Sequence, residues 1–548
     1  MLTGVSGPAG ATRAAQAGGG LGRRSRRAWR DRRGWRVAAV AAGVVLLFYC
    51  AQREARQMGV QSDGAGMVLE SWAMLHGNLL LHGWHLSDVS FYTTELPEYM
   101  LVELVRGLNP DVVRICAALT YTLLVVLAAA VAYGARPADK RTALVRAGIT
   151  VAVMIGPTVA ATTVLLNDPD HTGTAVPILL ALLVLDRGRR RWWVPLLVAA
   201  LLGWALVGDS LVLLIGVAPL VIVCGARSFG LLALRGQPLA VARYDLSLAA
   251  AGLAGAIGGT ALSALIKSSG GFTLSPQATQ YAVQSAAVPA NAAATVSNFL
   301  GLFSADFFGA RLNAWLAVTA VHLAFACLVA GGLFVALRAS GRNFLHGDLI
   351  AQLLAAALVI NLLGYLLLYP ASSATVREIA PVFGLGGALA GRVLGEPLLR
   401  RRLEPLLALG AVAAVAVLLP PLLTVTPTAP AASGLARFLA AHDLSSGLAG
   451  YWDADSSTLD SAGRVVVRTV RFRAGQGLVA YPWEIDTRLY DSGANDANFL
   501  VATGPGSPSA VTVPEAVAAF GRPYRSYRYQ GYTILVWQQN LLGLLRSS

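Results

Sequence analysis

The chain has 548 residues, of which 55% are hydrophobic and only 13% are charged, and its mean hydropathy is +0.59. Soluble proteins carry charges on about a quarter of their residues, so this composition excludes an ordinary soluble protein and predicts a polytopic membrane protein. The net charge of +14 does not predict nucleic-acid binding, because 26 of the 43 basic residues lie at the N-terminus or in alternate short loops, a pattern that orients membrane helices.

The N-terminal segment is rich in arginine. Eight arginines fall within residues 23–36, after a stretch that is mostly glycine and alanine. Such a segment cannot bury an apolar core, so we predict that residues 1–36 are disordered and lie against anionic headgroups on the cytoplasmic side. The apolar run that begins at Val37 is the first predicted span, and the polar loop after it, residues 52–111, is predicted to lie outside.

Regular apolar runs continue through residues 37–425, which we predict to be the transmembrane domain. The eleven predicted spans are 37–51, 112–134, 147–165, 174–186, 192–207, 211–225, 246–266, 312–337, 348–369, 379–394 and 405–425. Basic residues are concentrated in every second connection, as the positive-inside rule requires. We therefore expect a multi-pass protein of the plasma (inner) membrane, with a cytoplasmic N-terminus and an extracytoplasmic C-terminus.

The last part of the chain is less hydrophobic. A linker rich in proline and threonine, residues 426–433, precedes a segment, 434–548, with the composition of a soluble domain. Its alternating patterns predict strands near 464–472 and 498–503, a helix near 514–521 and a closing strand pair that turns at Gln530 and Gly531. The predicted fold class is an all-α polytopic membrane bundle of about eleven helices with a C-terminal soluble α/β or α+β extracytoplasmic domain.

Asp63 follows the first predicted span, where the outer ends of several helices would surround its carboxylate. Glu70 lies two helical turns further along if this segment is a helix. A carboxylate in this position could act as a base or bind a substrate. The alternative is that Ser62 and Asp63 cap the helix, since both are favoured at helix N-termini.

The second predicted outer turn places two acids and an imidazole next to each other at Asp168, Asp170 and His171. Acids separated by one residue can share a divalent cation such as Mg²⁺ or Mn²⁺, and a histidine can join them on Mn²⁺. The alternative is a tight turn, which also favours Asn, Asp and Pro.

Arg377 lies at the predicted outer mouth of a late span, where the positive-inside rule gives no reason for a basic residue. A planar guanidinium at the membrane surface is suited to a lipid phosphate. The alternative is a structural ion pair, for example with Glu378.

The segment that contains Tyr92, Glu95 and Glu98 mixes aromatic and acidic residues, a combination that stacks on a sugar ring and forms hydrogen bonds to it. The same residues could instead form an aromatic belt at the membrane interface. Three histidines lie close together in the sequence, at His76, His82 and His85. We interpret them as solvated or capping side chains in preference to a zinc site, because the cysteines that could complete such a site lie in or beside apolar spans.

In their order along the chain, these elements resemble the GT-C class of membrane glycosyltransferases, which includes protein O-mannosyltransferases, lipid A aminoarabinose transferases and bacterial arabinosyl- and mannosyltransferases. The resemblance covers the topology of most of residues 37–425 and rests on Asp63, the acidic turn at 168–170 and Arg377 with Pro381. Many members of the class have a second acid at the first motif, where this chain has Gly64, Ala65 and Gly66.

The resemblance implies a bacterial enzyme that transfers a sugar from a polyprenyl-phosphate donor to an acceptor at the outer face of the membrane. It implies that Asp63 is the general base, that Arg377 binds the donor phosphate, and that Asp168, Asp170 and His171 shape the donor site or hold a cation. The acceptor would be a glycan, a lipid or a protein. No cofactor is expected to be required, and no phosphate-binding nucleotide loop is present.

Two other classes of function are compatible with the sequence. A transporter or lipid flippase would have ionisable residues within its spans and broken helices in symmetric halves. A non-catalytic membrane protein would use its C-terminal domain, residues 434–548, to bind cell-wall glycan.

Overall fold

The computed structural model describes residues 14–136, 139–157, 159–167, 171–188, 190–275, 283–308, 315–403, 432–504 and 510–546, with isolated residues between 405 and 424. The chain consists of two units, residues 1–49 and residues 50–548. The described part of the first unit belongs to helix α1 (Ala14–Ala55), which continues into the second unit.

Helix α1 corrects the prediction for the N-terminus. Residues 14–36 are helical, whereas the sequence analysis predicts disorder over residues 1–36; residues 1–13 lie outside the described residues. Alanine and arginine are good helix formers, and a helix that has already nucleated in an apolar run extends at little further cost. The composition argument considered the arginine-rich segment alone and therefore missed its continuity with the first span.

Seven helices of the described residues are long and apolar enough to cross a membrane, in agreement with the predicted multi-pass membrane protein. They are Val37–Ala55, Asp111–Tyr133, Leu213–Leu234, Leu239–Ser268, Leu316–Asn343, Leu349–Leu368 and Val376–Arg400. Each overlaps one of the eleven predicted spans.

The count of about eleven spans is not confirmed. The predicted span 147–165 is divided between α5 (Lys140–Val153) and α6 (Val159–Leu165), and 174–186 corresponds to the 13-residue helix α7 (Ala175–Arg187). The predicted span 192–207 is the 16-residue apolar helix α8 (Trp193–Gly208). The range 405–425 lies mostly outside the described residues.

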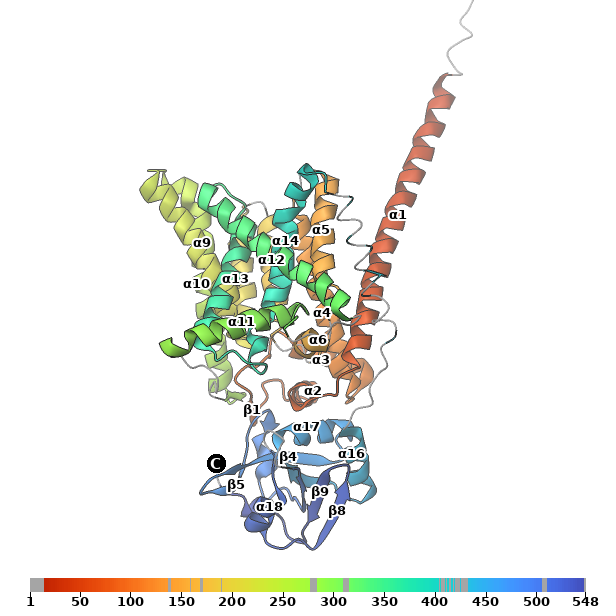
Figure 1. The fold of residues 1–548 in the computed structure, drawn as a ribbon, viewed down its shortest axis with the longest axis vertical. Coiled ribbons are helices and arrows are strands. Elements are labelled where there is room, and N and C mark those ends of the chain that lie inside the picture. The colour runs from red at the N-terminus through yellow and green to blue at the C-terminus, as the bar shows by residue number, and fades with distance from the viewer. Residues whose placement is uncertain are drawn as a thin grey trace, which may run out of the picture. The chain divides into compact units, whose positions relative to one another are not determined.

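Besides α1, α5, α6, α7 and α8, the helical region consists of long helices, which include the remaining candidate spans, and of short helical segments between them (Figure 1). They are α4 (Asp111–Tyr133), η1 (Leu213–Val217), α9 (Ala218–Phe229), η2 (Gly230–Leu234), α10 (Leu239–Ser268), η3 (Ser285–Ala287), α11 (Val288–Leu302), α12 (Trp315–Asn343), α13 (Leu349–Leu368), η4 (Val376–Ile379) and α14 (Pro381–Arg400). The closest packing brings α8 against α10, where Gly203 faces Gly255 and Gly259 and the two backbones approach each other. Small residues permit this approach between membrane helices.

A charge network centred on a buried arginine ties four helices together. The Arg392 guanidinium of α14 contacts Asp348, which precedes α13, at 2.6 Å, and Asp186 of α7 at 2.9 Å. It also donates a hydrogen bond to the carbonyl oxygen of Val131 in α4. Because a charge within an apolar bundle requires partners, these contacts fix the relative positions of the helices.

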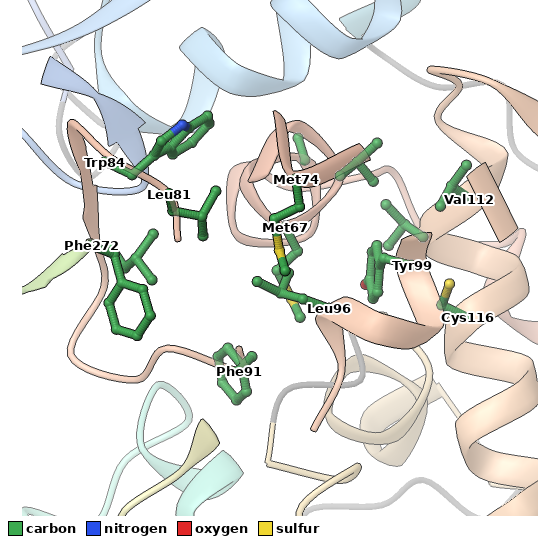
Figure 2. Close-up of a cluster of buried hydrophobic side chains, with 14 of the residues drawn as sticks. Met67, Met74, Leu81, Trp84, Phe91, Leu96, Tyr99, Val112, Cys116 and Phe272 are labelled. Carbon is green, nitrogen blue, oxygen red and sulfur yellow. The ribbon is translucent and has the colours of Figure 1, made fainter. Parts of the chain in front are cut away.

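The predicted outer loop 52–111 is folded. It contains α2 (Ser62–Leu75), the short strand β1 (Trp84–Leu86) and α3 (Leu96–Arg106). Figure 2 shows the apolar cluster that holds these elements, in which Met67 and Met74 of α2 lie with Leu96 and Tyr99 of α3. Leu96 and Tyr99 are completely buried, so the cluster anchors α2 to the helical region.

Three distant segments meet in a small sheet of order β2-β1-β6. Strand β1 pairs in parallel with β2 (Thr273–Leu274) and antiparallel with β6 (Ile485–Asp486), so that Trp84 faces Asp486. This sheet joins the loop after α1 and the loop after α10 to the C-terminal domain. It is one of the contacts that fix the C-terminal domain against the rest of the second unit.

The C-terminal region forms a six-stranded mixed sheet with helices (Figure 1). Its elements are α16 (Ala432–Ala441), β3 (Ser446–Ala449), α17 (Tyr451–Asp460), β4 (Val466–Arg473), β5 (Gly477–Ala480), η5 (Thr487–Tyr490), β7 (Phe499–Ala502), α18 (Val513–Phe520), β8 (Arg525–Tyr529), β9 (Tyr532–Val536) and η6 (Leu542–Leu544). The sheet order is β5-β4-β3-β7-β9-β8, and its central strands β4, β3 and β7 are parallel.

The elements predicted in this region from the sequence are present as β4, β7, α18 and the hairpin β8–β9. The hairpin turns at Gln530 and Gly531, whose φ angles are +46° and +88°, in the region that glycine adopts without strain. The sequence analysis did not predict β3 or α17. Helix α17 packs on α2, and this contact brings the C-terminal domain to Asp63.

Candidate active site

Asp63 is the second residue of α2 and lines a small cavity of about 20 Å³. The polar and aromatic side chains around this cavity are those of Asp63, Ser87, Asp88, Phe91, His171, Arg377, Trp483 and Glu484. A volume of this size holds about one water molecule. The cavity therefore joins charged groups from four separate parts of the chain around a very small space.

The Asp63 carboxylate faces Arg377, whose Nη1 lies 3.5 Å from Oδ2 of Asp63. Arg377 belongs to η4, the short turn just before α14. The side chains are 20% and 36% exposed, so this pair is accessible from solvent. A partly exposed pair contributes little to stability, at most about 1 kcal/mol, so replacing Asp63 by another anion beside the guanidinium would cost little through this pair.

The N-cap residue of α2 is Gln61, so Asp63 lies within the first turn of the helix. The alternative of an ion pair for Arg377 is present, with Asp63 as a partner at 3.5 Å. Glu378 lies 3.7 Å from Nε2 of His171. Helix α2 begins where predicted, but its first turn points toward other chain segments.

A tyrosine of the C-terminal domain bridges Asp63 to a second carboxylate. The Tyr451 hydroxyl group forms hydrogen bonds to Asp63 and to Oε2 of Glu484, the latter at 2.7 Å. In addition, the Ser62 hydroxyl group donates a hydrogen bond of 2.5 Å to the Tyr451 carbonyl oxygen. Tyr451 is 6% exposed, so it approaches the partly exposed Asp63 from the buried side.

Glu484 fits against α2 because residue 66 is glycine. A Cβ at position 66 would lie 2.7 Å from Oε2 and 3.0 Å from Cβ of Glu484. The backbone of Glu484 has φ +54°, which is unfavourable for a side chain other than glycine or asparagine. The glycine of the Asp63 motif therefore makes room for an acid that comes from the other end of the chain.

Two further acids, Glu70 of α2 and Asp455 of α17, lie behind this pair. Both are nearly fully buried, at 3% and 2% exposed. Burial raises the pKa of Glu70 well above its usual value, with a smaller contribution from the charge of Asp455. The pKa of Asp455 is also raised, by burial and by the charge of Asp63.

His171 stands at the other side of the cavity, held by a buried acid. Its Nδ1 lies 2.8 Å from Oδ2 of Asp209, which also accepts a hydrogen bond from the Thr174 hydroxyl group. Burial by itself would raise the pKa of Asp209, but the charge and hydrogen bond of His171 lower it overall. The imidazole is therefore oriented through its Nδ1, with Nε2 toward Glu378.

Asp168 and Asp170 lie outside the described residues, so the predicted cation site stays a prediction. In the part of the chain that the structure describes, no three His, Cys, Asp or Glu residues are arranged to hold a metal ion. His76, His82 and His85 each contact a different partner. Nδ1 of His76 and Nδ1 of His82 each lie within hydrogen-bond distance of a backbone carbonyl oxygen. Nδ1 of His85 lies 3.2 Å from the Ser275 hydroxyl group.

The structure does not bring Tyr92, Glu95 and Glu98 to the walls of this cavity. The Tyr92 hydroxyl group donates to the carbonyl oxygen of Leu79, and Glu98 accepts a hydrogen bond of 2.7 Å from Thr120 of α4. Glu95 is buried beside Gly173. Their predicted contact with acceptor or sugar stays a prediction.

Sequence reasoning missed the contribution of the C-terminal domain to this site, which consists of Tyr451, Asp455 and Glu484. The acids of the segment 451–460 were visible as a cluster, but nothing in a single sequence indicates that residues almost 400 positions apart meet. The one local signal was the glycine at position 66, which marks a close approach by another part of the chain.

Comparisons with known proteins add a structural likeness. No family model matches the chain, and no curated protein matches its sequence. Among solved structures, the chain is similar to ArnT from Cupriavidus metallidurans in a crystal structure bound to undecaprenyl phosphate, with 13% sequence identity and a TM-score of 0.47. The match covers 92% of this chain and 98% of ArnT. A TM-score below 0.5 does not establish a shared fold, so the site residues have to carry any conclusion about function.

Proposed function

We propose that the protein is a membrane glycosyltransferase of the GT-C type, which moves a sugar from a polyprenyl-phosphate donor to an acceptor hydroxyl group at the outer face of the membrane. The observation that supports this most directly is the meeting of Asp63 and Arg377 at 3.5 Å in one partly exposed cavity. One group is a base and the other is a cation suited to phosphate, which are the two functions that such a transfer needs.

In the proposed reaction, Asp63 takes the proton of the acceptor hydroxyl group as the acceptor oxygen bonds to the anomeric carbon of the sugar. The bond between that carbon and the phosphate oxygen breaks, and its electron pair leaves with the phosphate. Arg377 balances the negative charge of this leaving group. Because the phosphate already activates the donor, the reaction needs no nucleotide.

The cavity has to enlarge when the donor binds. A volume of about 20 Å³ is far below the roughly 300 Å³ of a typical small-molecule site. The donor phosphate would replace Asp63 as the partner of Arg377, and this exchange would release Asp63 for the acceptor. Donor binding and activation of the base would thus be coupled.

A second cavity offers space for the lipid of the donor. It has a volume of about 360 Å³ and is lined by apolar side chains of α11, α12 and α13 together with Val382 of α14. Val382 follows Arg377 by five residues, so the lining begins close in sequence to the proposed phosphate ligand. An apolar cavity beside a cation suits a lipid phosphate.

The test uses the full-length protein in proteoliposomes. Asp63→Asn should lower sugar transfer by a factor of about 10² to 10⁴ and leave binding of undecaprenyl phosphate intact. Arg377→Ala should weaken that binding and lower transfer by about 10² to 10³. The matched control is Arg400→Ala, since Arg400 is exposed at the end of α14 and pairs only with Glu396 in the described residues.

Full transfer activity in both Asp63→Asn and Arg377→Ala would contradict the proposal. The assay uses a panel of polyprenyl-phosphate sugars as donors. Movement of the lipid across the bilayer without transfer of any of these sugars would instead favour a flippase. A protein that shows neither sugar transfer nor lipid movement, and whose glycan binding is unchanged by both substitutions, would favour a non-catalytic role.

A further inference from the structure

The C-terminal domain meets α2 at the carboxyl end of a parallel strand. Strand β3 ends at Ala449, and Gly450 leads directly into α17, so that Tyr451 stands at the strand end with its ring toward Asp63. The neighbouring strands β4 and β7 run parallel to β3. Parallel sheets commonly place functional groups at this edge, and here the edge is occupied by the start of α2.

The hydrogen bonds of Tyr451 favour a proton on one of its two acids. A phenol has a single proton to donate, yet the Tyr451 oxygen lies within hydrogen-bond distance of both Asp63 and Glu484. If both carboxylates were ionised, one of them would face the lone pairs of the phenol oxygen. A proton on one of the acids would remove this repulsion, because that acid would then donate to the Tyr451 oxygen.

The surroundings place this proton on Glu484. Asp63 is partly exposed and faces the Arg377 guanidinium. Glu484 is 5% exposed, and among the described residues no cation lies within ion-pair distance of it. Burial raises the pKa of Glu484 well above its usual value, and the charges of Asp63 and Glu70 add to this effect. The resulting chain runs from the Glu484 O–H to the Tyr451 oxygen and from the Tyr451 O–H to the Asp63 carboxylate.

We infer that Tyr451 and Glu484 are positioning residues for the base Asp63, so that the C-terminal domain completes the active site through the hydrogen-bonded chain Glu484, Tyr451 and Asp63. This inference rests on the proposed function, in which Asp63 is the base. The Tyr451 hydroxyl group fixes one carboxylate oxygen of Asp63 and favours its ionised form, which is the form that accepts a proton. The protonated Glu484 in turn fixes the direction of the Tyr451 proton.

Several charged and titratable groups face Asp63 or the side chains around it. They come from α2, the loop after β1, the turn at 171, η4, α17 and the segment before β6, and they are Glu70, Asp88, His171, Arg377, Glu378, Tyr451, Asp455 and Glu484. Tyr451 itself stays neutral through the assay range, because burial and the neighbouring acids raise its pKa. Its hydroxyl group is thus available as a donor at every pH at which Asp63 titrates.

The first test is the pH dependence of sugar transfer by Tyr451→Phe in proteoliposomes. This substitution keeps the ring and removes the hydroxyl group, so the Asp63 carboxylate loses a hydrogen bond that favours its charged form. We expect kcat to fall by about 10- to 100-fold, the acidic limb of the kcat profile to move to higher pH by about one unit, and KM for the donor to stay within about twofold. The matched control is Tyr532→Phe, which removes a hydrogen bond of 3.2 Å to Asp453 within the same domain.

The second variant separates positioning from folding. Glu484→Gln keeps an N–H donor where the inference puts the acid O–H, so we expect it to retain much more of kcat than Glu484→Ala and to keep the acidic limb of the wild-type profile. A wild-type kcat and pH profile in Tyr451→Phe would overturn the inference. So would a Glu484→Gln variant that is as impaired as Glu484→Ala.

Infrared spectroscopy gives a readout that does not depend on the reaction. At neutral pH the difference spectrum between the wild type and Glu484→Gln should show the loss of one protonated carboxyl band, and Tyr451→Phe should shift that band. An unchanged carboxyl region in both variants would contradict the inference. If Asp63→Asn and Arg377→Ala are both fully active, the proposed function fails; if Asp63→Asn is inactive and Tyr451→Phe behaves as the wild type, only this inference fails.

Discussion

Replacing Gly66 by alanine tests the contact between α2 and the C-terminal domain. The added Cβ would lie 2.7 Å from Oε2 and 3.0 Å from Cβ of Glu484, both well inside normal contact distance. The Glu484 side chain cannot move away easily, because Tyr451 holds its carboxyl group and its backbone is constrained at φ +54°. Overpacking of this kind costs about 1–3 kcal/mol of stability, against a gain of up to about 1 kcal/mol for alanine over glycine in a helix.

The two opposing effects are separated by a double-mutant cycle with Glu484→Gly. Glycine at position 484 removes the side chain that collides with the new Cβ and also adopts φ +54° without strain. In this background Gly66→Ala should no longer destabilise the protein, so the coupling free energy of the cycle should be about 1–3 kcal/mol. The free energy of unfolding is measured by denaturant titration of the purified protein in detergent.

The control for this cycle is Gly301→Ala. Gly301 lies near the end of helix α11, and a Cβ at this position would meet no atom within 4 Å. Alanine there should leave stability unchanged or raise it by up to about 1 kcal/mol. If Gly66→Ala has the same effect whether residue 484 is glutamate or glycine, the two residues do not pack against each other and the site described here is wrong.

Two further predictions concern stability. Burial raises the pKa of Glu103 from 4.5 to about 8 and that of Glu98 to about 7, so the folded state binds these protons more tightly than the unfolded state. Stability should therefore be highest below about pH 4.5 and fall as the pH rises toward 8. Glu103→Gln should flatten this slope in thermal unfolding measured from about pH 4.5 to 8.5. Arg392→Met should destabilise the protein by about 3–5 kcal/mol, because it leaves the carboxylates of Asp186 and Asp348 without their shared cation, whereas Arg400→Ala on the same helix should change stability by less than about 0.5 kcal/mol. A pH-independent melting temperature, or equal effects of the two arginine substitutions in detergent, would contradict these expectations.

Much of the fold could be predicted because membrane spans and strands leave local signals. Seven predicted spans correspond to helices of sufficient length, and the closing hairpin turns at Gln530 and Gly531 as its sequence indicates. The predictions were less successful where an element depends on its partners. Helices α5, α6, α7 and α8 are short, and the count of about eleven spans, which includes these segments, is not confirmed.

Asp63, His171 and Arg377 were chosen from the sequence because a charged side chain beside an apolar span is costly without a function or a partner. Sequence periodicity places each of them near the end of a helix, and this is local information. Their convergence on one cavity is a property of the tertiary structure.

The sequence by itself determined that the chain is built of apolar helices with a C-terminal domain of strands and helices, because hydrophobic periodicity acts over a few residues. Only the tertiary structure decided what surrounds Asp63. Glu484 reaches it from a position 421 residues further along the chain, through the space left by Gly66, and Tyr451 joins the two acids. Such contacts depend on how helices α2 and α17 pack together; in the local sequence, Gly66 marks a space but not the side chain that fills it.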